Sequence, residues 1–173
     1  IPLRWINYQD IDEGVDVALL STLYEIDNQS LGGKSSNKAL TSARKKVVKK
    51  SKTLNDQLAQ INNLASQQSN KIIAFYSDYD KFLTALSKKL KPNAISVWTL
   101  GNRKVAKQEI FMNKIMIELC EHYHMKLLTN FTRHILNKRM PKLNGYQGEE
   151  KGLQSTMTRE HILIFVRSDS KNE

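Results

Sequence analysis

The sequence predicts an α/β fold that contains about half of an open sheet together with a long helical region. Three observations support this prediction. Apolar residues recur at a three-four spacing from residue 37 to residue 90, which is typical of helices. From residue 93, short β-rich runs alternate with a single further helix. A length of 173 residues allows one buried core, but the strands are few for an independent sheet. The sequence therefore indicates that part of the sheet is missing.

Composition favours a globular protein of a reducing compartment. Hydrophobic residues make up 40% of the chain and charged residues 25%. No run approaches the roughly 18 apolar residues of a membrane span, and the N-terminus lacks the basic-then-apolar pattern of a signal peptide. The single cysteine, Cys120, excludes an internal disulfide and lies in an apolar helical stretch, so we expect a buried thiol. These features predict a cytoplasmic location.

The net charge of +10 is unevenly distributed along the chain. Eight basic residues and no acid lie between Asp27 and Asp56. They are Lys34, Lys38, Arg44, Lys45, Lys46, Lys49, Lys50 and Lys52. Further acid-free basic spans cover 81–107 and 126–142. Such spans favour a nucleic acid, because each neutralised phosphate releases counterions. The alternative is a solvated helix face.

Four segments are predicted along the chain. Residues 1–30 form an irregular and partly helical start that would join the missing half, and 31–90 form a helical basic region for possible DNA recognition. Residues 91–167 read as strand, helix, strand, loop, strand, and 168–173 as a tail. In the helical region, we expect one helix over 37–68, then a second capped by Ser69 or Asn70 and ending before Pro92.

The third segment predicts a particular pairing of strands. Strands are expected at 93–101, 125–136 and 160–167, with a helix over 106–124 and a glycine-rich loop over 144–154. A strand-helix-strand order favours a parallel pair, so the first two strands are expected to be neighbours. The last strand is expected to pair antiparallel with its predecessor.

The tetrapeptide "LGNR" at the tip of the first strand is a candidate ligand site. Strand tips of open α/β sheets are where ligands bind. Gly101 allows a sharp turn there, Asn102 offers a donor and an acceptor, and Arg103 offers a planar fork for a phosphate or a base edge. The alternative is a plain strand-to-helix turn.

A second basic cluster follows the second strand in "NKRMPKLNG". It contains Lys138, Arg139 and Lys142, which would clamp a phosphate if they lay beside Arg103. The alternative is a solvated loop. The four histidines have no spacing typical of a metal site, so none is predicted.

Five stretches taken in order resemble a known family. They are "DNQSLGGK", "FYSDYDKF", "VWTLGNRKV", "ILNKRMPKLN" and "STMTREHILIF". In this order they are similar to the C-terminal half of site-specific, S-adenosylmethionine-dependent DNA methyltransferases of restriction-modification systems. The resemblance extends from about Gln29 to Val166. It implies the C-terminal half of a Rossmann-like sheet with a long helical insertion, and methylation of adenine N6 or cytosine N4.

The resemblance also implies that a companion is needed. Family members carry a glycine-rich loop for the cofactor and a (Ser/Asp/Asn)-Pro-Pro-Tyr tetrapeptide that activates the target amine. This chain has only Pro2, Pro92 and Pro141, and no Gly-x-Gly after a strand. The resemblance therefore implies a subunit or fragment that has no catalytic residue and is inactive alone. S-adenosylmethionine would be bound mainly by a complementary methyltransferase chain.

Site roles follow from the same resemblance. Gly101, Asn102 and Arg103 would lie at the rim of the target-base pocket or at its flanking phosphate. Double-stranded DNA would be held by Lys38, Arg44, Lys45, Lys46, Lys49, Lys50, Lys138, Arg139 and Lys142. Two alternatives stay open: a non-catalytic nucleic-acid-binding module and a fragment of a related RNA methyltransferase.

Overall fold

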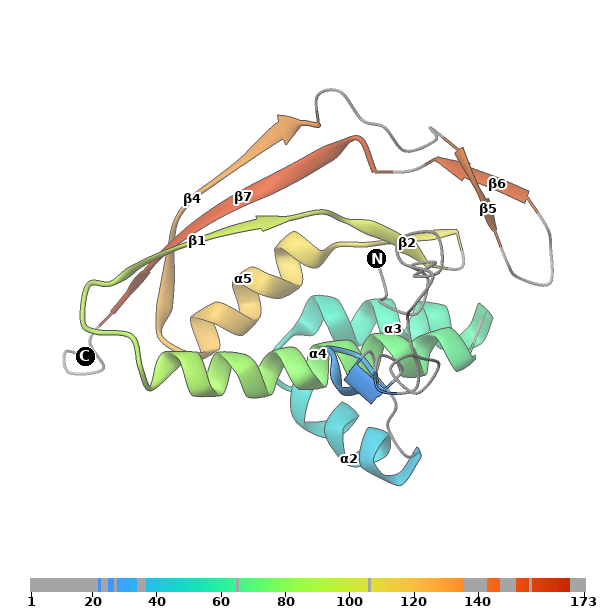
Figure 1. Ribbon diagram of the computed structural model, residues 1–173, viewed down its shortest axis with the longest axis horizontal. Coiled ribbons are helices and arrows are strands. Elements are labelled where there is room, and N and C mark those ends of the chain that lie inside the picture. Colours follow the sequence, from blue (N-terminus) through green and yellow to red (C-terminus); the bar gives the residue numbers. More distant parts are fainter. Residues whose placement is uncertain are drawn as a thin grey trace, which may run out of the picture.

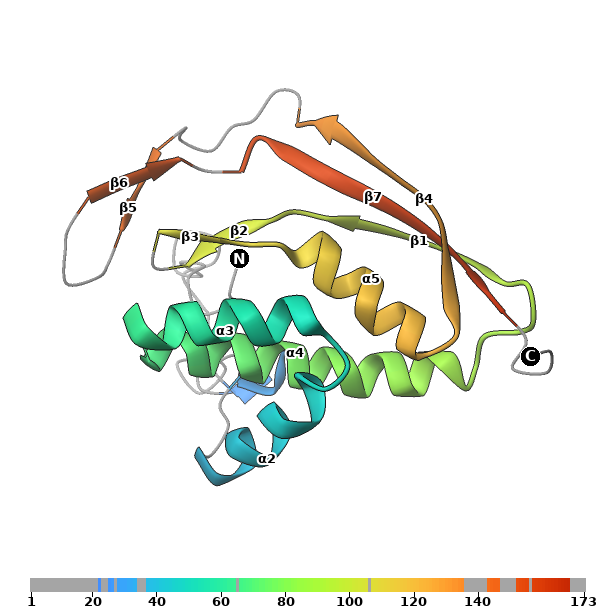
Figure 2. The same cartoon turned by 180° about the vertical axis from the view of Figure 1, so that it is seen from behind.

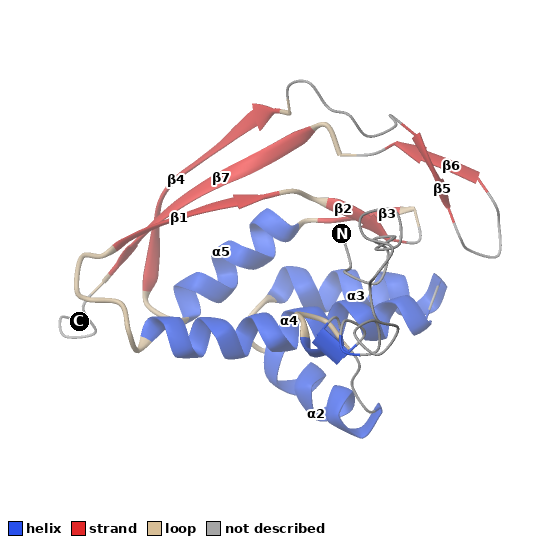
Figure 3. Cartoon of the chain, viewed as in Figure 1, coloured by secondary structure: helices blue, strands red, loops and turns tan. Residues whose placement is uncertain are grey.

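The computed structural model of the protein describes residues 22, 25–26, 28–33, 37–64, 66–105, 107–135, 143–146, 152–155 and 157–168. Its helices are α2 (Asn37–Val47), α3 (Lys52–Leu64), α4 (Ser66–Ser87) and α5 (Met112–His122). Its strands are β1 (Ile95–Leu100), β2 (Arg103–Val105), β3 (Gln108–Ile110), β4 (Met125–His134), β5 (Leu143–Tyr146), β6 (Gly152–Ser155) and β7 (Arg159–Arg167). These four helices lie on one side of the main sheet, with α5 directly against the strands (Figures 1 and 3). None of them is long and apolar enough to cross a membrane.

The main sheet has the order β1-β7-β4, and β7 is antiparallel to both neighbours. The predicted antiparallel pairing of the last strand with its predecessor is confirmed. The predicted parallel neighbours are wrong: β1 and β4 run in the same direction, but β7 lies between them. The connection through α5 places β4 one strand away from β1, and β7 fills the gap with hydrogen bonds on both sides.

Two hairpins were not predicted. β2 and β3 pair antiparallel, with Val105 opposite Gln108, and β5 pairs with β6. The hairpin turn contains Lys107 with φ at 63°, a left-handed conformation that a helix cannot include. The helix expected from residue 106 therefore begins at Met112.

The helical region consists of three helices instead of the predicted two. The expected long helix stops after Val47 and restarts at Lys52. Ser51 is 1% exposed, and its Oγ accepts a hydrogen bond of 3.0 Å from the Leu54 N–H. This is the N-cap arrangement that starts a helix. The next helix begins at Ser66, so the predicted cap Ser69 lies inside it and is buried.

Helices and sheet share one hydrophobic core. Leu163 and Phe165 of β7 have no exposed surface, and neither have Met116 and Leu119 of α5 or Leu83 of α4. Aromatic rings continue this contact toward β1, since the Tyr79 and Trp98 ring centroids lie 6.0 Å apart. Trp98 therefore packs on the core side of its strand.

Cys120 confirms the prediction of a buried thiol. It has no exposed surface, and burial raises the pKa of its thiol to about 12. A thiol with such a pKa is almost entirely protonated at neutral pH and is a poor nucleophile.

Candidate functional site

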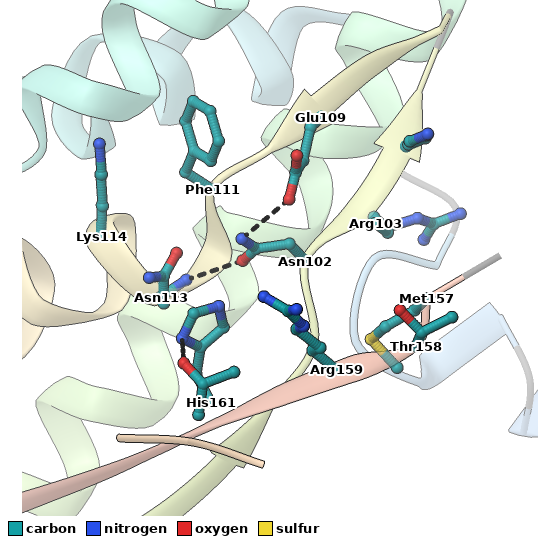
Figure 4. A pocket seen from close by; sticks show the side chains of 13 residues that line it. Asn102, Arg103, Glu109, Phe111, Asn113, Lys114, Met157, Thr158, Arg159 and His161 are labelled. Carbon is teal, nitrogen blue, oxygen red and sulfur yellow. Dashed lines mark hydrogen bonds between the residues drawn. The ribbon is translucent and has the colours of Figure 1, made fainter. Parts of the chain in front are cut away.

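A pocket of about 740 Å³ lies where β1 and β4 end and β7 begins. The β2–β3 hairpin and the first turn of α5 close its other sides (Figure 4). It is lined by Gly101, Asn102, Arg103, Lys104, Glu109, Phe111, Asn113, Lys114, Thr132, Met157, Thr158, Arg159 and His161. The sequence motif at 101–103 thus lies in the pocket wall, at the end of a sheet strand as expected.

Asn102 connects two elements of the pocket wall. Its Nδ2 donates to Glu109 Oε1 at 3.2 Å, and its Oδ1 accepts from the Asn113 N–H at 3.4 Å (Figure 4). The first bond joins it to β3 and the second to the first turn of α5. The Asn102 side chain therefore fixes the hairpin relative to the helix, and both ends of its amide are already used.

Gln57 on α3 holds the same wall from behind and was missed by sequence reasoning. It is 9% exposed, its Nε2 donates to the Glu109 carbonyl at 2.6 Å, and its Oε1 accepts from the Phe111 N–H at 3.1 Å. These bonds connect the helical region to the strand end of β3. A glutamine within an amphipathic helix has no local pattern that would have revealed this role.

Positive charge predominates around the pocket. Four lining residues are basic, namely Arg103, Lys104, Lys114 and Arg159, and one, Glu109, is acidic. All four basic side chains are exposed. Lys114 lies over the Phe111 ring, with its Nζ 4.8 Å from the ring centroid. An excess of three positive charges over one opening attracts anions such as phosphates.

The first turn of α5 adds to this preference. Its N-cap residue is Phe111, whose side chain makes no capping hydrogen bond. The positive end of the helix dipole is thus directed toward a cationic opening. Asn113 in this turn is 9% exposed, and its buried Oδ1 has no hydrogen-bond partner among the residues that the structure describes. The Asn113 Oδ1 can therefore accept a hydrogen bond from one more donor beneath the pocket.

Gly101 has no unusual backbone angle, and the space beside it is occupied by a flexible side chain. Its φ is not in the left-handed region, in contrast to Gly32 at 78°. A Cβ on Gly101 would overlap the sulfur of Met157, which is itself 42% exposed. At the position where a sharp turn was expected, the structure therefore shows a close approach of the end of β1 to the start of β7.

The predicted basic residues of the helical region lie away from the pocket. Lys38 is in the first turn of α2, Lys45 and Lys46 are exposed in its last turn, and Lys49 is exposed just after it. Arg44 is half-buried. α2 lies on the opposite side of α3 and α4 from the sheet (Figures 1 and 2). The structure therefore presents two separate cationic surfaces.

Lys50 departs from the expected DNA-binding set. Its Nζ lies 2.9 and 2.7 Å from the two carboxylate oxygens of Asp80 and 2.6 Å from the Tyr123 hydroxyl. Desolvation lowers the pKa of Lys50, but these hydrogen bonds outweigh it, so the pKa is raised above its ordinary value. An ammonium held by two partners is unavailable to a phosphate, so we assign Lys50 to the internal structure.

The remaining predicted basic residues lie outside the described part of the chain. They are Lys138, Arg139 and Lys142. Their expected place beside Arg103 stays a prediction.

Comparison with curated proteins relates the chain to a methyltransferase. The relative is the type II methyltransferase M.MvaI of Kocuria varians, which is 28% identical over an alignment of 181 positions. The alignment covers 98% of this chain and 36% of that protein, so the chain spans about a third of its relative's length. No family model and no solved structure matches the chain significantly.

Proposed function

We propose that this chain is the DNA-contacting, C-terminal half of an S-adenosylmethionine-dependent DNA methyltransferase that modifies adenine N6 or cytosine N4. The observation that carries the proposal is the similarity to a type II methyltransferase over 98% of the chain. The cationic pocket at the strand ends supports it independently, because its charge suits a polyanion. The enzyme thus acts on the amino group of a base in duplex DNA.

In this function the pocket borders the extruded target base and holds its flanking phosphate. Enzymes that modify a base remove it from the stack, which costs a few kcal/mol and is offset by pocket and backbone contacts. Arg103, Lys114 and Arg159 provide exposed donors for phosphate oxygens around the opening. Asn102 acts as a positioning residue, since its amide bonds fix the hairpin that carries Arg103.

The pocket is poorly suited to the sulfonium group of S-adenosylmethionine. The sulfonium of that cofactor is positively charged, and so are four of the pocket's side chains. The single carboxylate, Glu109, already accepts from Asn102. This disagreement supports the assignment of the cofactor site, together with the Pro-Pro-Tyr motif, to a companion half that this chain joins.

The proposal is tested by methylation of duplex DNA with this chain and its companion half together, and with this chain alone. Only the combination is expected to bind S-adenosylmethionine and transfer methyl groups. Replacing Asn102 by alanine is expected to lower kcat/KM about tenfold or more, because two positioning hydrogen bonds of about 1 kcal/mol each are lost. Asn63→Ala, on the exposed side of α3, is the matched control.

Two results would contradict this assignment. Methyl transfer by the chain alone would refute the division between two halves. An Asn102→Ala enzyme as active as the Asn63→Ala control, but inactivated by Lys45→Glu and Lys46→Glu, would indicate a nucleic-acid-binding module whose pocket has no part in the reaction.

A further inference from the structure

The first turn of α5 begins without a cap of its own. Its N-cap residue is Phe111, whose side chain offers no hydrogen-bond acceptor. Helices usually begin with Ser, Thr, Asp or Asn at this position, because their first backbone N–H groups need acceptors from outside the helix. In α5, acceptors for this turn come from other parts of the chain.

Two side-chain amides from distant segments supply these acceptors. Asn102 Oδ1, after β1, accepts from the Asn113 N–H at 3.4 Å, as described above. Gln57 Oε1, on α3, accepts from the Phe111 N–H at 3.1 Å. Asn113 is the second residue of the helix, whose N–H a capping side chain ordinarily binds. The two amides thus cap α5 from outside.

The same two amides also donate to one residue, Glu109 of β3. Gln57 Nε2 donates to the Glu109 carbonyl at 2.6 Å, and Asn102 Nδ2 donates to the Glu109 carboxylate at 3.2 Å. Each amide therefore bridges β3 and the first turn of α5, and we call this pair, Gln57 and Asn102, the amide clamp. An amide suits this task, since it offers a donor and an acceptor side by side without a net charge.

The two members of the amide clamp differ in their access to the pocket. Asn102 lies in the pocket wall (Figure 4). Gln57 is 9% exposed and does not line the pocket. Gln57 can therefore affect a pocket ligand only through the connection that it holds, residues 109–113. That connection and the helical turn after it carry Phe111 and Lys114, which line the pocket.

We infer that Gln57 is a second positioning residue, which holds the pocket wall in the shape that receives the extruded target base. This inference rests on the proposed function and adds to it a residue that lies behind the pocket. The exposed basic side chains around the opening keep their charge when the amide clamp is loosened, so binding of duplex DNA is retained. A displaced wall gives the extruded base fewer contacts, so the base returns to the stack more often. Loss of Gln57 therefore lowers kcat and spares duplex binding.

Gln57→Met, made in the methyltransferase that contains this chain, tests the inference. Methionine has nearly the length of glutamine but has no N–H and only a weak acceptor, so both bonds of Gln57 are lost. Gln60→Met, at an exposed position of the same helix, is the control. Because a misplaced wall impairs the reacting geometry, we expect Gln57→Met to lower kcat about tenfold and to change the Kd for duplex DNA less than about twofold.

A second duplex separates positioning from a mere loss of folded protein. In it, the base that the native enzyme methylates is mispaired and so costs less to extrude. This duplex is expected to restore most of the lost kcat in Gln57→Met and to change kcat of the control less than about twofold. A purely structural role would lower the amount of active enzyme equally on both duplexes.

Equal kcat of Gln57→Met and Gln60→Met on the paired duplex, in an enzyme that methylates DNA, would overturn the inference and leave the proposed function intact. A loss of kcat that the mispair does not restore would also overturn the inference. A native enzyme that methylates no DNA would overturn the proposed function and the inference with it. If thermal unfolding shows that Gln57→Met is unfolded at the assay temperature, Gln57→Glu replaces it with the same expected results, since it keeps the acceptor for the Phe111 N–H and removes the donor.

Discussion

Replacing Lys50 by methionine separates a structural role of this lysine from a role in DNA binding. Lys50 belongs to the same run of basic residues as Lys49, but the two side chains have different surroundings. The Lys49 side chain is exposed, whereas the Lys50 side chain is 20% exposed and forms an ion pair with Asp80. Methionine keeps most of the volume of lysine and removes only the ammonium.

The expected loss of stability follows from the contacts of the ammonium. Without it, Asp80 loses two short hydrogen bonds in a position where its side chain is 12% exposed. Tyr123 continues to donate to Asp80 Oδ1 at 2.7 Å, so the carboxylate keeps one partner. A charge-assisted hydrogen bond contributes about 1.5–3 kcal/mol, and an uncompensated buried charge costs somewhat more. We therefore expect Lys50→Met to reduce the free energy of unfolding by about 2–3 kcal/mol.

Two measurements check this expectation. Thermal unfolding should show Tm lowered by about 5–10 °C in Lys50→Met, and unchanged within a degree or two in Lys49→Met. Binding of a DNA duplex at several salt concentrations should be changed by Lys49→Met and not by Lys50→Met. Removing one phosphate contact reduces the slope of log K against log salt by about one. We expect that reduction for Lys49→Met and not for Lys50→Met at a temperature where both are folded.

The opposite pattern would refute this reasoning. If Lys50→Met kept its Tm and had the smaller salt slope, the ammonium would contact phosphate in the complex and the ion pair with Asp80 would contribute nothing. The original assignment of Lys50 to the DNA-binding set would then be correct.

Three further predictions concern the core and its connections. Because the pKa of Lys50 is raised above 10.5 in the folded protein, its contribution is complete below about pH 10.5 and is lost as the pH rises through the folded-state pKa. Denaturant unfolding should therefore show a steeper loss of stability at high pH in the native protein than in Lys50→Met, and parallel curves would contradict this. Glu118 of α5 accepts hydrogen bonds from Thr53 at the N-terminus of α3. Glu118→Ala should therefore lower the free energy of unfolding in urea by about 2 kcal/mol, whereas the control Glu121→Ala, at an exposed position of α5, should lower it by less than about 0.5 kcal/mol. The buried thiol of Cys120, with its pKa of about 12, should react with Ellman's reagent at pH 8 only on unfolding, and rapid reaction of the folded protein would disprove its burial.

Local patterns predicted the long elements of the fold, and non-local pairing determined the rest. The helices and the three main strands were found because their apolar periodicity is a property of neighbouring residues. The order of the strands was not found, because β1 and β4 each pair with β7. β7 is far from β1 in the sequence and is separated from β4 by a long connection. β2 and β3 were missed because each has three residues and no alternation.

The same distinction applies to the candidate site. The motif at 101–103 was recognised because a glycine, an amide and a guanidinium directly follow an apolar strand. Gln57 and Asn113 were missed because they come from two helices and meet the pocket only through tertiary packing. Lys49 and Lys50 are equivalent in a charge run, and only the position of Asp80 on α4 distinguishes them. The roles assigned to the pocket residues stay predictions.

The central position of β7 determines how this sheet can be completed. β7 is the last described strand of the chain, yet it hydrogen-bonds to both of the others. Among the described strands, β1 and β4 therefore have no partner until the chain has been made as far as β7, and both edges of the resulting sheet belong to earlier strands. One of these edges, on β4, is interrupted by a bulge. The outer edge of β1 has no such interruption, and its exposed side chains Ile95 and Val97 lie on the uncovered face beside it. The same strand leads to Gly101 in the pocket wall, so whatever covers this edge would lie close to Asn102 and Arg103.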